Sequence, residues 1–195
     1  MERRLTSVEH ASAYQLLAGK RGSLQARIGL HGAVGTSDDA DWWRVVASAG
    51  TTVRFAGLAV RGDGTIGRVN EDAPMFERFF VGGGPPVLVD DALLSQRLTM
   101  PALPFGIRSG PRAATVRFAL PGNLFEPYWW AASAGTRLDG WTRVLGVESR
   151  GSLGTLSGPM LAGITGVSYR GGVAYPLDAP VPKRLRAYFS LEWNP

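Results

Sequence analysis

Residues 24–34 read Leu-Gln-Ala-Arg-Ile-Gly-Leu-His-Gly-Ala-Val, and this stretch decides the fold class. Leu24 and Ile28 fall on one side of an extended chain, whereas Arg27 and His31 fall on the other. Successive side chains of a β-strand point to opposite faces, so the alternation predicts a strand with one apolar face and one polar or small face.

The carboxy-terminal residues repeat this alternation in its clearest form. Phe189 and Leu191 share one face, and Arg186 and Glu192 occupy the other. The preceding run, residues 165–175, alternates as well, and three prolines lie in the connection between the two runs. Because proline cannot donate a hydrogen bond to a sheet, the pattern predicts two antiparallel strands joined by a proline-rich connection.

Segments rich in glycine and proline separate the other alternating runs, and no stretch of a dozen residues has a helical period. We therefore predict an all-β, antiparallel fold of about eight to twelve strands. The 195 residues fit one domain, so residues 1–195 are treated as a single β-barrel or as part of a larger one. The predicted strands are residues 11–17, 24–34, 42–49, 51–61, 66–69, 76–81, 94–99, 113–120, 128–134, 141–150, 165–175 and 184–193.

Strand length and aromatic placement favour a membrane β-barrel over a soluble one. Strands of about ten residues match what a tilted strand needs to cross a bilayer. In such a barrel the apolar face meets lipid, while the polar face lines the interior. Aromatic residues crowd the strand ends, where interfacial girdles would lie. The expected interfacial aromatics are Trp42, Trp43, Trp129, Trp130, Trp141 and Trp193.

The polar faces of the predicted strands carry single arginines, which we expect to line the barrel interior. These arginines either form a cationic lumen or pair with acids such as Glu148 and Glu192. The narrow interior of a barrel of eight to ten strands favours pairing. The expected lumen-lining residues are Arg27, His31, Arg54, Arg117, Arg143, Arg186 and Glu192.

The stretch 76–84 reads Phe-Glu-Arg-Phe-Phe-Val-Gly-Gly-Gly. It resembles a Phe-x-Leu-Gly-Gly segment in the barrel of the Omp85 or bacterial surface antigen family. The terminal stretch 171–193 looks like the last hairpin of such barrels. The resemblance implies a bacterial outer-membrane location, a sixteen-strand barrel of which this chain supplies part, and a structural, anchoring or passive transport role. The motif residues that carry it are Phe79, Phe80, Gly82 and Gly83.

The composition offers little for catalysis or metal binding. Cysteine is absent, and His10 and His31 are the two histidines. A nucleophile motif is missing as well, so we expect no enzymatic activity, no cofactor and no metal. The net charge of +5 comes from dispersed arginines, which argues against nucleic-acid binding. The expected partners are the lipid bilayer and the rest of a larger barrel or other outer-membrane proteins.

Two alternatives remain open. The first is a soluble β-barrel that binds a small apolar ligand; it would place Leu185, Phe189 and Leu191 inside and Arg186 and Glu192 outside. The second is an outer-membrane-embedded hydrolase, which would require His31 as its base. The direction in which Phe189 and Arg186 point therefore separates the membrane barrel from the soluble one.

Overall fold

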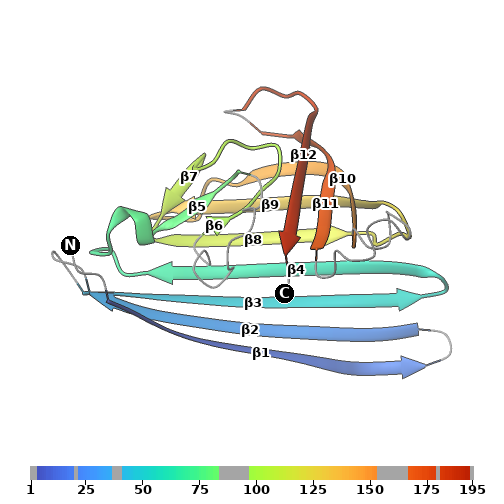
Figure 1. Cartoon of the computed structure of the whole chain (residues 1–195), viewed down its shortest axis with the longest axis horizontal. Helices are drawn as coiled ribbons and strands as arrows, with labels where there is room; N and C mark the ends of the chain where they lie inside the picture. The colour runs from blue at the N-terminus through green and yellow to red at the C-terminus, as the bar shows by residue number, and fades with distance from the viewer. Residues whose placement is uncertain are drawn as a thin grey trace.

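The structure, a computed structural model, describes residues 4–19, 22–36, 41–83, 97–152, 167–178 and 181–193. Nine strands form one antiparallel sheet (Figure 1). The all-β prediction is confirmed. The described part of the chain has no helix long and apolar enough to cross a membrane. The nine strands, in sheet order, are β1 (Arg4–Gly19), β2 (Gly22–Thr36), β3 (Asp41–Phe55), β4 (Leu58–Val69), β8 (Arg112–Ala119), β9 (Glu126–Gly135), β10 (Thr142–Ser152), β11 (Val167–Pro176) and β12 (Arg186–Trp193).

The large sheet is a meander that curls strongly along its width. Strands β1 to β4 run side by side, and β10 to β12 turn across them (Figure 1). The sheet order begins with β1 and ends with β12, and no pairing among the described residues joins these two edge strands. Closure of the sheet into a barrel therefore stays a prediction.

The boundary between β3 and β4 differs from the predicted one. The sequence interpretation ended one strand at Ala49 and ran the next over residues 51–61, whereas β3 continues to Phe55. The chain reverses at Ala56 and Gly57, where φ is 49° and 84°. Phe55 pairs directly with Leu58, so Ala56 and Gly57 form a two-residue hairpin loop. The backbone twist of such a loop matches the twist of the flanking strands. The gap between the strands predicted over residues 51–61 and 66–69 is likewise wrong, since β4 runs through it.

An insert between β4 and β8 forms a second, small sheet. It contains η1 (Met75–Glu77), β5 (Phe79–Val81), β6 (Arg97–Leu98) and β7 (Arg108–Gly110), with β5 in the middle. The strand predicted over residues 76–81 is therefore a 3-10 turn followed by a short strand. Of the strand predicted over residues 94–99, the first three residues lie outside the described part of the chain.

The insert packs on one face of the large sheet, which we call the inner face. The ring of Phe79, fully buried, lies where a side chain at Gly67 of β4 would be. Phe79, Val81 and Met100 of the insert belong to the main apolar core together with residues of the large sheet, and β5 and β7 lie against β9. Gly82 and Gly83 follow β5 with φ of 105° and 81°, a conformation that favours glycine. The opposite side of the large sheet is the outer face.

Candidate functional site: the inner and outer faces of the sheet

A buried carboxylate, Glu148 of β10, lies on the inner face among the carboxy-terminal strands. Its side chain is 0% exposed and accepts hydrogen bonds from Arg117 of β8 at 2.6 Å and from Arg170 of β11 at 2.9 Å. The hydroxyl of Tyr188 of β12 donates to the same carboxylate at 2.9 Å, and Arg150 pairs with it as well. A buried carboxylate is stable as an anion only when it is paired and hydrogen-bonded, and Glu148 meets both conditions.

The network extends from Glu148 toward the amino-terminal strands. Arg117 also donates to Glu126 of β9 at 2.7 Å, and Glu126 pairs with Arg61 of β4. Arg61 contacts Asp63 at 3.1 Å, and Asp63 accepts a hydrogen bond from Arg27 of β2 at 2.8 Å. The inner ion-pair network therefore runs continuously across seven of the nine strands, β2, β4 and β8 to β12.

Two strand glycines allow tyrosines to lie across the inner face. The ring of Tyr128 of β9 occupies the space that a side chain at Gly146 of β10 would need. The Tyr188 hydroxyl lies over Gly172 of β11 in the same way. The guanidinium carbon of Arg117 lies 4.9 Å from the centroid of the Tyr128 ring, a cation–π contact. Glycine at these positions therefore makes room for the side chains that connect β9, β10, β11 and β12.

A buried ion pair holds the insert on the inner face. Arg44 of β3 donates to Glu77 of η1 at 2.9 Å, and the two side chains are 2% and 1% exposed. Arg108 of β7 donates to the Thr142 hydroxyl of β10 at 2.9 Å. The insert is thus attached by charge at one side and by a hydrogen bond at the other, in addition to its apolar core.

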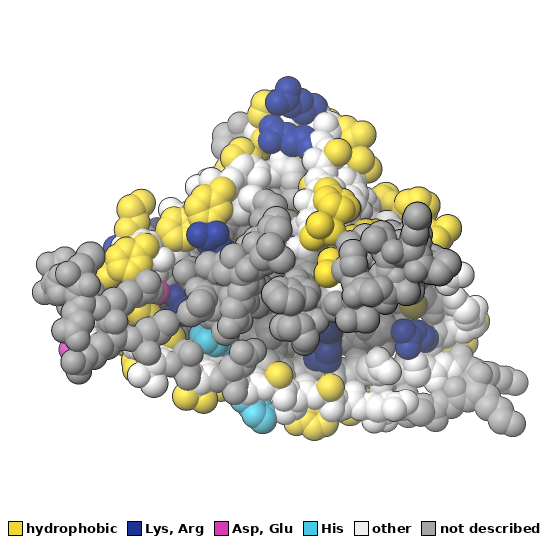
Figure 2. All heavy atoms as spheres, viewed as in Figure 1, with side chains coloured by type: hydrophobic (Ala, Val, Ile, Leu, Met, Phe, Trp, Pro, Cys, Tyr) yellow, Lys and Arg dark blue, Asp and Glu magenta, His cyan; other side chains and the backbone are white. Residues whose placement is uncertain are grey.

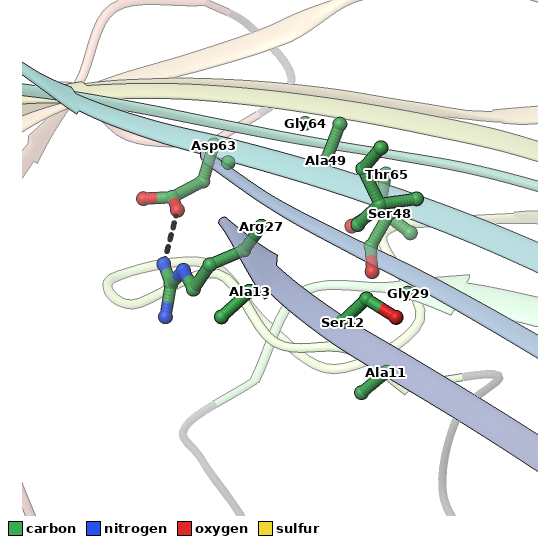
Figure 3. A pocket seen from close by; sticks show the side chains of 12 residues that line it. Ala11, Ser12, Ala13, Arg27, Gly29, Ser48, Ala49, Asp63, Gly64 and Thr65 are labelled. Atoms are coloured by element: carbon green, nitrogen blue, oxygen red, sulfur yellow. Dashed lines mark hydrogen bonds and ion pairs between the residues drawn. The ribbon is translucent and has the colours of Figure 1, made fainter. Parts of the chain in front are cut away.

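The inner face is hollow where the insert does not cover it. A cavity of about 450 Å³ lies over β1 to β4. Its lining is small or polar and includes Ala11, Gly29, Ser48 and Thr65 (Figure 3). The Arg27–Asp63 ion pair lies at one side of this cavity (Figure 3). The inner face therefore offers polar, uncrowded space beside the ion-pair network.

The outer face is apolar and largely exposed. On β12, Leu185 just before the strand and Phe189 within it are 66% and 65% exposed, whereas Ser190, on the inner side, is buried. Ala131 and Ser133 of β9 are exceptions, because both are buried on the outer side. Hydrophobic side chains gather along the outline of the molecule, and basic ones lie at the tip of the β11–β12 connection (Figure 2). Further exposed outer-face residues are Ile28, Leu30, Val34, Val45, Val53, Val60, Ile66, Phe118, Leu145, Val147 and Val173.

Aromatic side chains mark both ends of the exposed apolar band on β3. Trp43 lies at its start and Phe55 at its end, and both face outward. Twelve residue steps of about 3.3 Å give roughly 40 Å along the strand. For a strand tilted by about 40°, this corresponds to a height of about 30 Å, close to the thickness of a bilayer core.

The residues expected to line a lumen divide between the two faces. Arg27, Arg54, Arg117 and Arg186 lie on inner-face positions, and His31 does as well, with 7% exposure. Glu192 shares the inner register of β12, but its side chain lies outside the described set.

Arg143 of β10 differs from the other expected lumen residues, because it lies on the outer face. It binds Asp178 through two side-chain hydrogen bonds, at 2.8 and 3.0 Å, while its main-chain N–H donates to the same carboxylate at 2.7 Å. These hydrogen bonds lower the pKa of Asp178 below its ordinary value of 3.8. Arg143 thus fastens the end of β10 to the segment after β11 and does not line the interior.

The tryptophans expected at the membrane interface also divide between the outer and the inner face. Trp43 and Trp129 face outward, and Trp129 stacks on Phe118 with ring centroids 5.9 Å apart. Trp42 and Trp130 lie on the inner face, where Trp42 is buried against Gly35. Trp141 precedes β10 and is 39% exposed, and the side chain of Trp193 lies outside the described set.

Several site residues were not singled out from the sequence. Arg170, Arg61, Glu126 and Tyr188 join the network only because the register of β4 and of β9 to β12 brings them together. Arg170 and Tyr188 occupy the polar faces of their predicted runs, which was the available signal, whereas Glu126 lies before its predicted strand and Arg61 has the parity of the apolar residues in its run. The described residues contain no group of three or more side chains able to hold a metal ion.

Comparison of the chain with protein-family models, curated proteins and solved structures found no match. The resemblance to the bacterial surface antigen family therefore remains a prediction from the sequence.

Proposed function

We propose that this chain forms part of the wall of an outer-membrane β-barrel, with a structural, anchoring or passive transport role. The observation that carries the proposal is the polarity of the sheet. Charged side chains pair on the inner face, while large apolar side chains of β2 to β4, β8 and β10 to β12 are exposed on the outer face, and β9 contributes the half-buried Trp129 there. Lipid is the solvent that favours this arrangement.

The insert supports a barrel wider than nine strands. A barrel of about eight strands is filled by its own side chains. Here the inner face carries in addition the three strands β5 to β7, as well as a cavity of about 450 Å³. We therefore propose that further strands, from the rest of a larger barrel or from another outer-membrane protein, pair with the free edges of β1 and β12.

The soluble alternative fits the sheet less well. A soluble barrel would bury Leu185 and Phe189 and would expose the ion pairs, whereas both residues are more than 60% exposed and Glu148 is fully buried. A large exposed apolar surface marks a contact with lipid or protein. No observation on the described residues favours hydrolysis at His31, and the proposal assigns no reaction to the chain.

The absence of cysteine allows a direct test of orientation. Ala49→Cys and Ser48→Cys place single thiols on adjacent residues of β3, the first on the outer face and the second on the inner face. Each variant of the full chain is labelled with an environment-sensitive dye and reconstituted into phosphatidylcholine vesicles with or without lipids that carry a quencher on the acyl chain.

We expect strong quenching of the dye at position 49 and little at position 48. Detergent-dependent solubility and heat-modifiable migration on gels should accompany this result. Equal quenching at both positions, or a monodisperse protein without detergent, would contradict the proposal.

A further inference from the structure

Two arginines stand directly opposite each other on the outer face. Arg68 of β4 pairs in register with Arg112 of β8, and both are exposed. Directly opposed side chains on antiparallel strands have Cβ atoms about 5 Å apart, so like charges there repel each other. Among the described residues, neither arginine has an ion-pair partner. An anion held between the two guanidinium groups would remove the repulsion.

An aromatic residue lies beside this pair. The guanidinium carbon of Arg68 is 5.9 Å from the centroid of the Trp43 ring. Asn70 holds the main chain of Trp43 on both sides, accepting from its N–H at 2.9 Å and donating to its carbonyl at 3.2 Å. Tryptophan prefers the headgroup level of a bilayer. The arginine pair therefore lies where the phosphates of membrane lipids would be.

An apolar hollow begins next to the pair on the same two strands. Ile66 and Ala114, opposite each other, are the next outer-face residues after Arg68 and Arg112. From there a hollow of about 860 Å³ continues to Gly62 and Phe118. Its lining mixes small residues with the larger side chains of Ile28, Ile66 and Phe118. Its outer-face lining consists of Ala26, Ile28, Ala47, Ala49, Thr51, Gly62, Gly64, Ile66, Ala114, Val116 and Phe118.

We propose that this surface binds a phosphate-bearing lipid, with the phosphate between Arg68 and Arg112 and an acyl chain in the hollow. The inference rests on the proposed membrane location. Charge at one end and a shallow apolar hollow next to it match a lipid rather than a soluble anion, because a soluble phosphate would leave the hollow unused. Guanidinium groups bind phosphate oxygens by charge-assisted hydrogen bonds, which are stronger than neutral ones.

The test uses the full chain in an uncharged detergent and counts bound lipid by native mass spectrometry. The probes are phosphatidic acid, diacylglycerol with the same acyl chains, and inorganic phosphate. The double variant R68Q/R112Q removes the pair, and R54Q/R184Q is the control that removes two exposed arginines elsewhere. A further variant, Ala49→Leu, fills the hollow without changing the charge.

We expect one phosphatidic acid per chain, bound about twenty-five-fold more weakly by R68Q/R112Q, which is roughly fivefold for each guanidinium removed. The control double variant should bind as the unaltered chain does, and Ala49→Leu should weaken phosphatidic acid binding. Diacylglycerol and inorganic phosphate should each bind far more weakly.

Unchanged binding by R68Q/R112Q, or equally tight binding of inorganic phosphate, would overturn the lipid site. If the dye at position 49 is nevertheless quenched strongly and the dye at position 48 is not, the proposed membrane location still holds. Failure of the lipid site and failure of the membrane location are therefore distinguishable.

Discussion

The hydroxyl groups of Tyr188 and Tyr128 lie 3.2 Å apart, within hydrogen-bonding distance, although β10 and β11 separate their strands. Three strand spacings amount to about 14 Å in a flat sheet. The contact is possible because Gly146 and Gly172 leave space over the intervening strands and because the sheet curls toward its inner face. The tyrosine pair therefore connects the carboxy-terminal hairpin to the middle of the sheet.

Replacement of Tyr188 by phenylalanine should loosen this connection. The change removes the donor to Glu148 and the contact with Tyr128 but keeps the ring. A hydrogen bond to a charged group contributes about 1.5–3 kcal/mol, so the free energy of unfolding should fall by roughly that amount. Urea unfolding of the vesicle-reconstituted protein measures it. Tyr14→Phe, at an exposed position of β1, is the control and should change little.

Replacement of Glu148 by glutamine should lower the free energy of unfolding more than Tyr188→Phe does. The glutamine keeps the shape but leaves Arg117, Arg150 and Arg170 without their shared negative charge. Breaking a buried ion pair by neutralising one partner costs about 3–5 kcal/mol. Glu71→Gln, on an exposed residue before η1, is the control in the same unfolding experiment. A Glu148→Gln protein as stable as the control protein would show that the network contributes little.

The insert should separate from the sheet when Gly67 becomes alanine. The added methyl group would meet the ring of Phe79, which is fully buried in the core. Overpacking of this kind costs about 1–3 kcal/mol. At Gly64 of the same strand the nearest atom, the Thr115 carbonyl oxygen, is 3.5 Å away, so Gly64→Ala should be tolerated. We expect faster proteolysis within the insert for Gly67→Ala alone; equal rates for the two variants would contradict this.

The strand faces could be predicted from the sequence, whereas one turn and the ion-pair partners could not. Period-two alternation fixed which residues share a side, as the exposed Phe189 and buried Ser190 show. The turn between β3 and β4 was misplaced, because the strands predicted over residues 42–49 and 51–61 divide β3 at Gly50. In the structure Gly50 lies within β3, where a side chain would meet Asp63 and Arg27. Ala56, with φ of 49°, gives a weak turn signal because alanine seldom adopts that conformation.

The partners of the charged residues depend on register, which alternation alone does not specify. Arg117 was expected to face the interior and to pair with acids such as Glu148, and it does pair with Glu148. Arg143 was expected there as well, but it lies on the same face as Leu145 and pairs with Asp178. One residue step along β10 moves a side chain to the opposite face of the sheet. The face on which an arginine near a strand end lies therefore cannot be assigned from composition.

The Arg143–Asp178 pair should make the end of the β10–β11 hairpin sensitive to acid. The pKa of Asp178 is lowered, chiefly by the hydrogen bonds from Arg143, so the pair stabilises the fold above the ordinary aspartate pKa of 3.8. That stabilisation is lost as the pH falls through the lowered pKa, because the protonated carboxyl no longer attracts the guanidinium group. Both groups are near the surface, where solvent and salt screen the pair, so the effect should be small. The free energy of unfolding is measured from pH 6 downward. Asp178→Asn should abolish this part of its pH dependence. The control Asp139→Asn, at an exposed position before β10, should show the same pH dependence as the unaltered protein. A pH profile identical in the unaltered and Asp178→Asn proteins would show that the pair does not stabilise the hairpin.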